Sequence, residues 1–424
     1  MIFSQKPFKK IDFTFGGNRF DRAYKTIENA DGSMVILGDS FSDISGDKTE
    51  KSRGVTDIWV LKIDRLGNKI WDRTIGSDDY DSPVDIIKSK DGGYIILANS
   101  GGNISKDKSK GSQGAKGEKD IWIIKINKEG ETVWDKIIGG DGEDRADSII
   151  DTQDNSGYII AGTSSSNISG SKSESCRGRS DFWIIKINKN GDKLWDKTIG
   201  GENHDVSRGI IQKKNGDFII IGFSESRKCT DKMQEETGGW IVKLDSKGRK
   251  IWDKYIENAR SIYNTKDGGF VIAGGSASKT SKYKTEDCKG NWDFWINKFN
   301  SKDEIEWDKT IGGSGEDMPI SIIQTYDLGY VVVGYSKSNI SGDKSENIKG
   351  GQDDFWIVKL GMDGKKIWDK TLGGTGRDVP LSVIEASNHN YILSGYSDSN
   401  KCNDKIANGK GEYDVWIVII EELK

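Results

Sequence analysis

The stretch Asp354-Phe355-Trp356-Ile357-Val358-Lys359-Leu360 decides the fold of this chain, because close copies of it recur from one end to the other. Each copy is an apolar run around one tryptophan, and successive copies begin about sixty residues apart. The tryptophans of these copies are Trp59, Trp122, Trp183, Trp240, Trp295, Trp356 and Trp416. A fixed period of this length is typical of a repeat architecture, so the repeat predicts the fold before any local motif does.

Each period contains four short strands, which we name A to D in chain order. In the sixth period, residues 319–324 and 330–335 have the apolar, β-branched composition of strands A and B. Residues 354–359 form strand C, and residues 366–371 form strand D after a turn at Asp363-Gly364. Glycine recurs in this turn, where a residue without Cβ adopts a positive φ easily. No period contains a run of helical spacing, so the sequence predicts an all-β protein.

Four short strands, repeated seven times, predict a seven-bladed β-propeller of four-stranded antiparallel blades. The N-terminal residues 10–17 match strand D with Ile11 in the tryptophan place, whereas the last period stops after its strand C at residues 414–420. The N-terminal strand is therefore expected to pair with the C-terminal blade and close the ring. The tryptophans of the other D strands are Trp71, Trp134, Trp195, Trp252, Trp307 and Trp368.

This interpretation gives a single domain over residues 8–424, preceded by a tail at residues 1–7. One domain can reach this length because each repeat contacts its neighbours and no single central core is needed. The expected blades are approximately residues 16–75, 76–138, 139–199, 200–256, 257–311, 312–372, and 373–424 plus 8–15.

The repeat resembles the tryptophan-rich bacterial propeller repeat of about sixty residues. The shared pattern is Asp-Phe-Trp-Ile-Val-Lys-Leu, a glycine turn, Trp-Asp-Lys-Thr-Ile-Gly-Gly-x-Gly-x-Asp and then Asp-Gly-Gly-Tyr, and it extends from about residue 8 to residue 424. The resemblance implies the propeller fold and little about function, because members of the family are mostly uncharacterised.

The charge balance argues against a nucleic-acid-binding protein. The chain has 63 basic and 67 acidic residues and a net charge of −4, without the concentrated positive field that a phosphate backbone requires. No apolar run approaches the roughly 20 residues of a membrane span, and residues 1–8 lack the apolar core of a signal peptide. The compartment is therefore left open, cytoplasmic by default and secreted or cell-surface if a signal was removed. The chain is expected to be a monomer.

Four cysteines, Cys176, Cys229, Cys288 and Cys402, lie in the polar stretches between strands B and C. Free thiols in a reducing compartment are the simplest interpretation. A disulfide between neighbouring loops and a metal site are the alternatives.

The expected functional face is the one that carries the long loops from B to C and from D to A. The D to A loop repeats as Gly-Gly-x-Gly-x-Asp, and its carboxylate has two interpretations. It can accept backbone amides of its own loop as a structural anchor, or the carboxylates together can form a ring at the channel mouth that attracts cations or polar ligands. The aspartates are Asp21, Asp81, Asp144, Asp205, Asp317 and Asp378.

The B to C loop repeats as Asn-Ile-Ser-Gly-Asp-Lys-Ser-Glu, most clearly at residues 339–346. Asp47 and Asp343, next to serine hydroxyls and backbone carbonyls, are oxygen ligands of the kind that calcium prefers, although the spacing is not that of an EF-hand. In the third copy the aspartate becomes Ser171. A hydrogen-bonded loop without an ion is the alternative, and no other cofactor is expected.

The repeat is broken most strongly around the third to fifth periods. The D to A connection shortens there to residues 256–260 and loses its glycines and its aspartate. Four candidate ligand-binding residues are nearby, namely His204, Asp205, Arg260 and Trp292, an extra tryptophan in a B to C loop, and Cys176, Cys229 and Cys288 lie near them in the ring. As a hypothesis, they frame a notch in which Trp292 stacks on a sugar or another flat apolar group. Ordinary drift of one repeat is the alternative.

Catalytic signatures are weak, since the chain has no Gly-x-Ser-x-Gly elbow, His-Glu-x-x-His motif or Cys-x-x-Cys pair. We therefore expect a non-enzymatic binding or scaffold propeller that recognises a protein or glycan partner through its long-loop face. The alternative is a carbohydrate-active enzyme, a hydrolase or lyase, with an acidic site at the channel mouth. The two differ in symmetry, because an enzyme needs one unique set of catalytic groups in one cleft.

Overall fold

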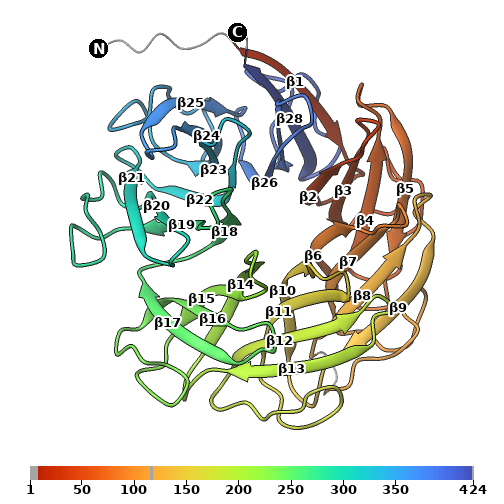
Figure 1. Ribbon diagram of the computed structural model, residues 1–424. Helices are drawn as coiled ribbons and strands as arrows, with labels where there is room; N and C mark the ends of the chain where they lie inside the picture. Colours follow the sequence, from red (N-terminus) through yellow and green to blue (C-terminus); the bar gives the residue numbers. More distant parts are fainter. Residues whose placement is uncertain (1–7, 115–117, 423–424) are drawn as a thin grey trace. The chain divides into compact units, whose positions relative to one another are not determined.

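The computed structural model describes residues 8–114 and 118–422, and the predicted tail at residues 1–7 lies outside them. The strands form seven antiparallel four-stranded sheets, each hydrogen-bonded in the order A, B, C, D, so the fold is the predicted seven-bladed β-propeller (Figure 1). In the described residues there is no helix, and hence none that could cross a membrane. Unit 1 comprises the chain up to Thr49, Lys62–Ile70 and the chain from Arg260, and unit 2 comprises Glu50–Leu61 and Trp71–Ala259.

Strand A carries a β-bulge at the same position in six blades, where one residue has no partner on strand B. The fifth blade differs, because the shortened connection removes the first half of its strand and the rest pairs only with residues 270–273. The bulged residues are Tyr24, Val84, Asp147, Arg208, Ile320 and Leu381. The A strands are β2 (Asp21–Glu28), β6 (Asp81–Lys88), β10 (Asp144–Asp151), β14 (Asp205–Gln212), β18 (Ser261–Asn264), β22 (Asp317–Gln324) and β26 (Asp378–Glu385).

Strand B is an apolar run that is buried over nearly its whole length. Such runs are expected where both faces of a sheet are covered, since no position then needs to be polar. The B strands are β3 (Met34–Ser40), β7 (Tyr94–Ser100), β11 (Gly157–Ser164), β15 (Phe218–Ser224), β19 (Phe270–Ser276), β23 (Tyr330–Ser336) and β27 (Tyr391–Ser397).

Strand C buries the tryptophan that defines the repeat. A buried indole N–H needs a hydrogen-bond acceptor, so a neighbouring strand must place an acceptor side chain beside it. The C strands are β4 (Asp57–Ile63), β8 (Asp120–Ile126), β12 (Asp181–Asn188), β16 (Gly238–Leu244), β20 (Asp293–Phe299), β24 (Asp354–Leu360) and β28 (Asp414–Glu422).

Strand D supplies this acceptor in every blade. Each strand C tryptophan donates from Nε1 to an aspartate of strand D at 2.9 to 3.2 Å, which explains why Trp-Asp follows the glycine turn in the repeat. The acceptors are Asp72, Asp135, Asp196, Asp253, Asp308, Asp369 and Asp12. The D strands are β5 (Lys69–Ile75), β9 (Thr132–Ile138), β13 (Lys193–Ile199), β17 (Lys250–Ile256), β21 (Ile305–Ile311), β25 (Lys366–Leu372) and β1 (Phe8–Phe15).

The seventh blade is completed by the N-terminal strand, as predicted. In Figure 1, β1 (red) lies beside β28 (blue), and the two strands pair antiparallel along the whole of β1. Ile11 pairs with Ile419, and the equivalent pair in the sixth blade is Trp368 with Lys359. Ile11 therefore stands in the tryptophan place, and the blade is closed by strands from opposite ends of the chain.

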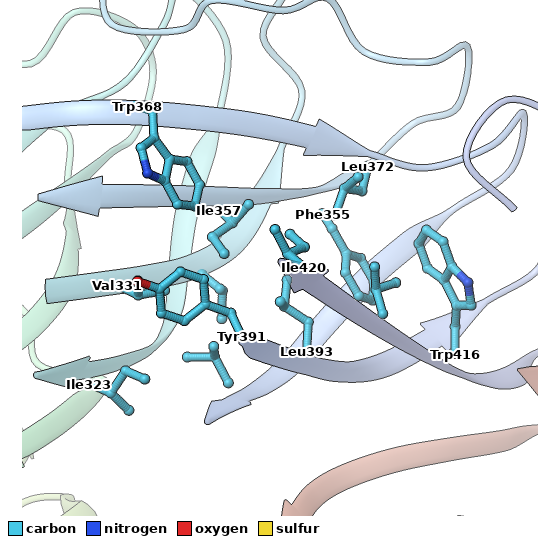
Figure 2. Packing of buried hydrophobic residues seen from close by; sticks show 13 residues of the cluster. Ile323, Val331, Phe355, Ile357, Trp368, Leu372, Tyr391, Leu393, Trp416 and Ile420 are labelled. Atoms are coloured by element: carbon cyan, nitrogen blue, oxygen red, sulfur yellow. The ribbon is translucent and has the colours of Figure 1, made fainter. Parts of the chain in front are cut away.

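Where strand C carries a phenylalanine, that ring packs on the strand C tryptophan of the next blade. In unit 1, the ring centroids of Phe355 and Trp416 lie 4.7 Å apart, and those of Phe294 and Trp356 lie 4.8 Å apart. Figure 2 shows Phe355 and Trp416 among the buried side chains of the sixth and seventh blades. Such aromatic pairs contribute about 0.5–1.5 kcal/mol beyond their buried area, so each Phe-Trp pair stabilises the junction between two blades.

The glycine of the C to D turn lies under an aromatic ring of the preceding blade. Gly364 has a φ of +74°, and a Cβ there would lie 2.8 Å from the ring of Trp307. At Gly67 the ring belongs to Phe13, because β1 carries Ile11 where other D strands carry tryptophan. Glycine is thus favoured at Gly364 both for its backbone angle and for the close ring, whereas the fifth blade has Asp303, with a φ of +66°, at this position of the turn.

The four cysteines are free, and they occupy positions at which other blades have serine. Cys176 Sγ donates to the carbonyl of Ser164 at 3.5 Å, as Ser112 Oγ donates to the carbonyl of Ser100 at 2.7 Å. Cys288 makes the equivalent contact. Burial raises the pKa of Cys176 to about 11, so this thiol is a loop hydrogen-bond donor and not a reactive thiolate.

Candidate functional site

The loop-bearing face is held in place by the aspartate that begins strand A. Oδ2 of Asp21 accepts the amide of Gly17 at 2.7 Å and the hydroxyl of Ser42, in the B to C loop, at 3.0 Å. Burial raises the pKa of Asp21 to about 6. Since all six of these aspartates are fully buried, they join the two loops and do not present an exposed ring of charge. The same amide contact, at 2.5 to 2.7 Å, is made by Asp81, Asp144, Asp205, Asp317 and Asp378.

A second aspartate, the first residue of strand C, faces this one across a blade junction. A Cβ on Gly16 would lie 2.0 Å from Oδ1 of Asp414 and 3.3 Å from Oδ2 of Asp21, so the two carboxylates meet over this glycine. At the next junction of unit 1, burial and the nearby Asp378 raise the pKa of Asp354 to about 7. Paired carboxyl groups of this kind hold protons near neutral pH.

The two calcium candidates lie in ionic contacts between blades. Oδ2 of Asp343 accepts the amide of Gly312 at 3.1 Å and the ammonium of Lys289. Asp47 accepts a backbone amide and the ammonium of Lys410 in the same way. Lysine thus supplies positive charge at both carboxylates, and no cluster of three potential metal ligands occurs in the part of the chain that the structure describes. Calcium binding at either aspartate stays a prediction, and it would require the ion to displace the lysine that is bound there.

Side chains that differ from blade to blade meet on the loop face of unit 1, and we name this set the arc. Its members lie at the loop ends of strands A and B and immediately before strand C. The residues at these positions vary between blades. The arc comprises Arg260, Trp292, Glu316, Tyr335, Lys337, Asp353, Arg377, Tyr396, Tyr413, Phe20, Arg22, Tyr24, Asp39 and Phe41.

At one end of the arc the last and first blades meet through aromatic rings. The ring centroid of Phe20 lies 5.2 Å from that of Tyr413 and 5.8 Å from that of Phe41. Tyr396 contacts Tyr413 edge-on at 5.1 Å. A parallel bridge between Phe20 and Tyr413 fixes the backbone beneath these rings. Four aromatic side chains from two blades therefore form one continuous surface.

An ion pair lies beside these rings on the first blade. Arg22 Nε and Nη2 donate to the two oxygens of Asp39 at 3.1 and 2.5 Å, a bidentate arrangement. The bulge on β2 brings Tyr24 to the same carboxylate, and its hydroxyl donates to Asp39 Oδ2 at 3.2 Å. Burial and the adjacent carboxylate raise the pKa of Tyr24, so the phenol stays neutral and acts as a hydrogen-bond donor.

A second ion pair lies in the middle of the arc. Arg377 Nε donates to Oδ2 of Asp353 at 2.6 Å, and Lys337 Nζ lies 3.7 Å from the same carboxylate. Next to them is a polar hollow of about 480 Å³ that is lined in part by Arg377 and Tyr413. The other residues that line it are Gly350, Gly351, Gln352, Thr375, Gly376 and Asp398.

The far end of the arc contains Trp292 and Arg260, two of the four residues predicted to frame a notch. Trp292 is 40% exposed and forms a parallel bridge with Glu316. Glu316 accepts Lys337 Nζ at 2.7 Å and the Tyr335 hydroxyl at 3.0 Å, and these contacts lower its pKa. The guanidinium of Arg260 forms no hydrogen bond with the described residues, and its Nε is buried.

The other two notch residues belong to unit 2. His204 Nδ1 lies 3.0 Å from the hydroxyl of Ser180, and Asp205 is one of the buried loop-anchoring aspartates. The notch as a four-residue site therefore stays a prediction, while Trp292 and Arg260 both take part in the arc.

One further residue of unit 2 has the environment of a functional group. Asp147, the bulged residue of β10, accepts the hydroxyls of Ser207 at 2.5 Å and Thr163 at 3.2 Å. Burial raises the pKa of Asp147 to about 6. The repeat pattern does not single out this carboxylate, although the bulge position carries a different residue in each of the six blades.

No family model matches this chain. A curated relative, the regulatory protein FlaEY of Caulobacter vibrioides, is 22% identical over 411 residues, which cover 88% of this chain. The match spans 42% of that relative's own length.

Two solved structures have similar folds. The WD40 domain of Pan2 from Neurospora crassa has a TM-score of 0.50 at 10% identity, covering 95% of this chain and 89% of that domain. Sqt1 from Chaetomium thermophilum has a TM-score of 0.45 at 8% identity, covering 99% and 100%.

Proposed function

We propose that this chain is a non-enzymatic binding propeller that recognises a protein partner through the arc. The observation that carries the proposal is the composition of the arc, which gathers one tryptophan, four tyrosines, two phenylalanines and three arginines on one loop-bearing surface. Tryptophan, tyrosine and arginine are the residues that contribute most binding energy at protein interfaces, because they bury large areas with little loss of conformational entropy.

The electrostatics of the arc favour binding over catalysis. Its three carboxylates, Asp39, Asp353 and Glu316, are each paired with arginine or lysine. A general acid needs a raised pKa, whereas contact with Lys337 lowers the pKa of Glu316. These carboxylates therefore fix the orientation of the basic side chains.

The comparisons support a recognition role without naming a partner. The fold is similar to that of the WD40 domain of Pan2, and the curated relative is described as a regulatory protein. Both likenesses are distant, so the choice of a protein over a glycan partner depends on the arc alone.

Site-specific photocrosslinking in the native cell tests the proposal. A benzoylphenylalanine at Tyr413, in the arc, is expected to crosslink one recurrent protein. The same residue at Tyr326, which is 69% exposed on an A to B turn, serves as the matched control. Equal capture at both positions, or none at Tyr413, contradicts a protein-binding arc.

The enzyme alternative has one specific residue in its favour, Asp147, because this carboxylate occupies a bulge position that has no aspartate in the other blades, and its pKa, raised by burial, suits a general acid. Purified protein incubated with a panel of polysaccharides would release reducing ends or unsaturated sugars if this function is correct. Loss of that activity in Asp147→Asn would support the enzyme, and absence of turnover in the wild-type protein would contradict it.

A further inference from the structure

The charged residues of the arc are paired, with one exception. Arg22 is bound to Asp39, Arg377 to Asp353 and Lys337 to Glu316. Arg260 has neither an ion pair nor a side-chain hydrogen bond among the described residues, and its Nε is inaccessible to water. Arg260 as a whole is only partly buried although its Nε is enclosed, and a guanidinium left without an acceptor is costly, so it is suited to an acceptor from outside the chain.

The position of Arg260 follows from the shortened strand A of the fifth blade, β18. β18 starts at Ser261 and pairs only with residues 270–273 of β19, whereas β22 in the next blade pairs with the full length of β23. The amide of Arg260 donates to the carbonyl of Ala273 at 2.9 Å, which places Arg260 where the strand is missing.

Trp292, just before β20, packs against the next part of β19. A Cβ on Gly275 would lie 3.2 Å from the ring of Trp292 and 2.8 Å from the sulfur of Met318. The sixth and seventh blades have Tyr335 and Tyr396 at the position of Gly275. Glycine there lets the indole lie against the backbone, next to the place that Arg260 occupies.

The charge around Arg260 limits which acceptor fits. Glu316 is close enough for Arg260 to lower its pKa, although Lys337 and Tyr335 hold its oxygens. The ionised Glu316 repels a doubly charged phosphate more strongly than a singly charged carboxylate, and a carboxylate also matches the planar fork of one guanidinium.

We infer, on the basis of the proposed function, that Arg260 and Trp292 together receive an acidic side chain of the partner protein. The aspartate or glutamate carboxylate is bound by the guanidinium, and an apolar or aromatic residue beside it packs on the exposed part of the indole. The arc thus recognises an acidic, aromatic peptide segment.

Selection from a random heptapeptide phage library against the full chain tests this inference. Wild-type protein is expected to enrich peptides with Asp or Glu at one fixed position beside an aromatic residue. Arg260→Gln is expected to lose that acidic preference and keep its melting temperature, while Arg249→Gln, on an exposed turn, is expected to select as the wild type does. Enrichment without an acidic preference overturns the inference. No enrichment above a blank surface contradicts the proposed function itself.

A double-mutant cycle with the best selected peptide gives the second measurement. Replacing its acidic residue by the amide is expected to weaken binding to the wild-type protein at least tenfold and to leave binding to Arg260→Gln nearly unchanged. An equal loss with both proteins shows that the carboxylate contacts another residue and overturns the assignment.

Discussion

The indole nitrogen of Trp416, on the last strand, donates a hydrogen bond of 3.0 Å to Oδ2 of Asp12, on the first strand. Asp12 also accepts the ammonium of Lys10 at 2.9 Å and the amide of Ile406 at 3.2 Å. This one carboxylate therefore joins residues that are about four hundred positions apart, and both it and Trp416 are buried.

Asp12→Ala is expected to lower the free energy of unfolding by about 3 kcal/mol, because it leaves a buried indole N–H unpaired and breaks a buried charged contact. Urea unfolding followed by circular dichroism measures the change. Asp363→Ala, on an exposed turn, is the control and should change stability by less than about 0.5 kcal/mol. Similar values for the two variants would show that the N-terminal strand does not hold the seventh blade.

The paired carboxyl groups predict an unusual pH dependence of stability. Burial raises the pKa of Asp120 and Asp354 to about 7, and that of Asp21 and Asp81 to about 6. In the unfolded chain these groups titrate near pH 4. The folded state therefore binds more protons between about pH 4 and 7, and the stability from these groups falls as the pH rises through that range.

The urea midpoint is accordingly expected to be higher at about pH 5 than at about pH 7.5. Asp354→Asn keeps the shape of the side chain but cannot ionise, so it should reduce the difference between the two midpoints. A wild-type midpoint that rises from pH 5 to pH 7.5 would show that these carboxyl groups are ionised in the folded protein without penalty.

The lysine–aspartate contacts between blades predict that an ion pair can be introduced at a junction that lacks one. Lys289 pairs with Asp343 across a blade junction, but at the junction of the second and third blades Gln113 Nε2 donates to Ser171 Oγ at a long 3.5 Å. The double variant Gln113→Lys with Ser171→Asp should show a favourable coupling of about 0.5–1 kcal/mol in a double-mutant cycle. Urea unfolding of both single variants and the double variant measures it, and a coupling of zero would mean that the two loops do not approach as closely as those of Lys289 and Asp343.

Two glycines with positive φ give a matched test of the blade junction. Gly92 has a φ of +87° with open space around it, whereas a Cβ on Gly364 would meet the ring of Trp307. Gly92→Ala should cost about 1 kcal/mol for the backbone alone, and Gly364→Ala about 3 kcal/mol because overpacking adds to the same strain. Thermal melts of the two variants compare these costs, and equal losses would exclude a tight contact with Trp307.

The fold was predictable because its physical requirements repeat. Each blade needs a buried tryptophan on strand C and an aspartate acceptor on strand D, so the pattern appears in every period, and it allowed residues 10–17 to be matched to strand D. The substitution of Ile11 for tryptophan was visible, but the role of Phe13 was not. The ring of Phe13 reaches Gly67 only if its side of the strand faces the neighbouring blade, and the sequence does not show which side does.

The arc was only partly predictable, for the opposite reason. Trp292 and Arg260 break the repeat and were recognised as candidates, whereas Tyr396 and Tyr413 differ from their counterparts without an obvious loss of pattern. Their contact with Phe20 joins residues from opposite ends of the chain, and sequence spacing does not show which loops become neighbours. The β-bulges that carry Tyr24 and Asp147 are also silent in the sequence, because a strand with one extra residue keeps its apolar composition.

The pairing of β1 with β28 sets a delay in biosynthesis. β1 begins at Phe8 and β28 at Asp414, so at about 5–20 residues per second the ribosome delivers the partner about 20–80 s after the first strand. During that interval β1 has no partner in its own blade, and the charges of Lys9, Lys10 and Asp12 discourage it from joining the sheets of other nascent chains. A chain interrupted before β28 keeps an unfinished blade that cellular proteases can recognise.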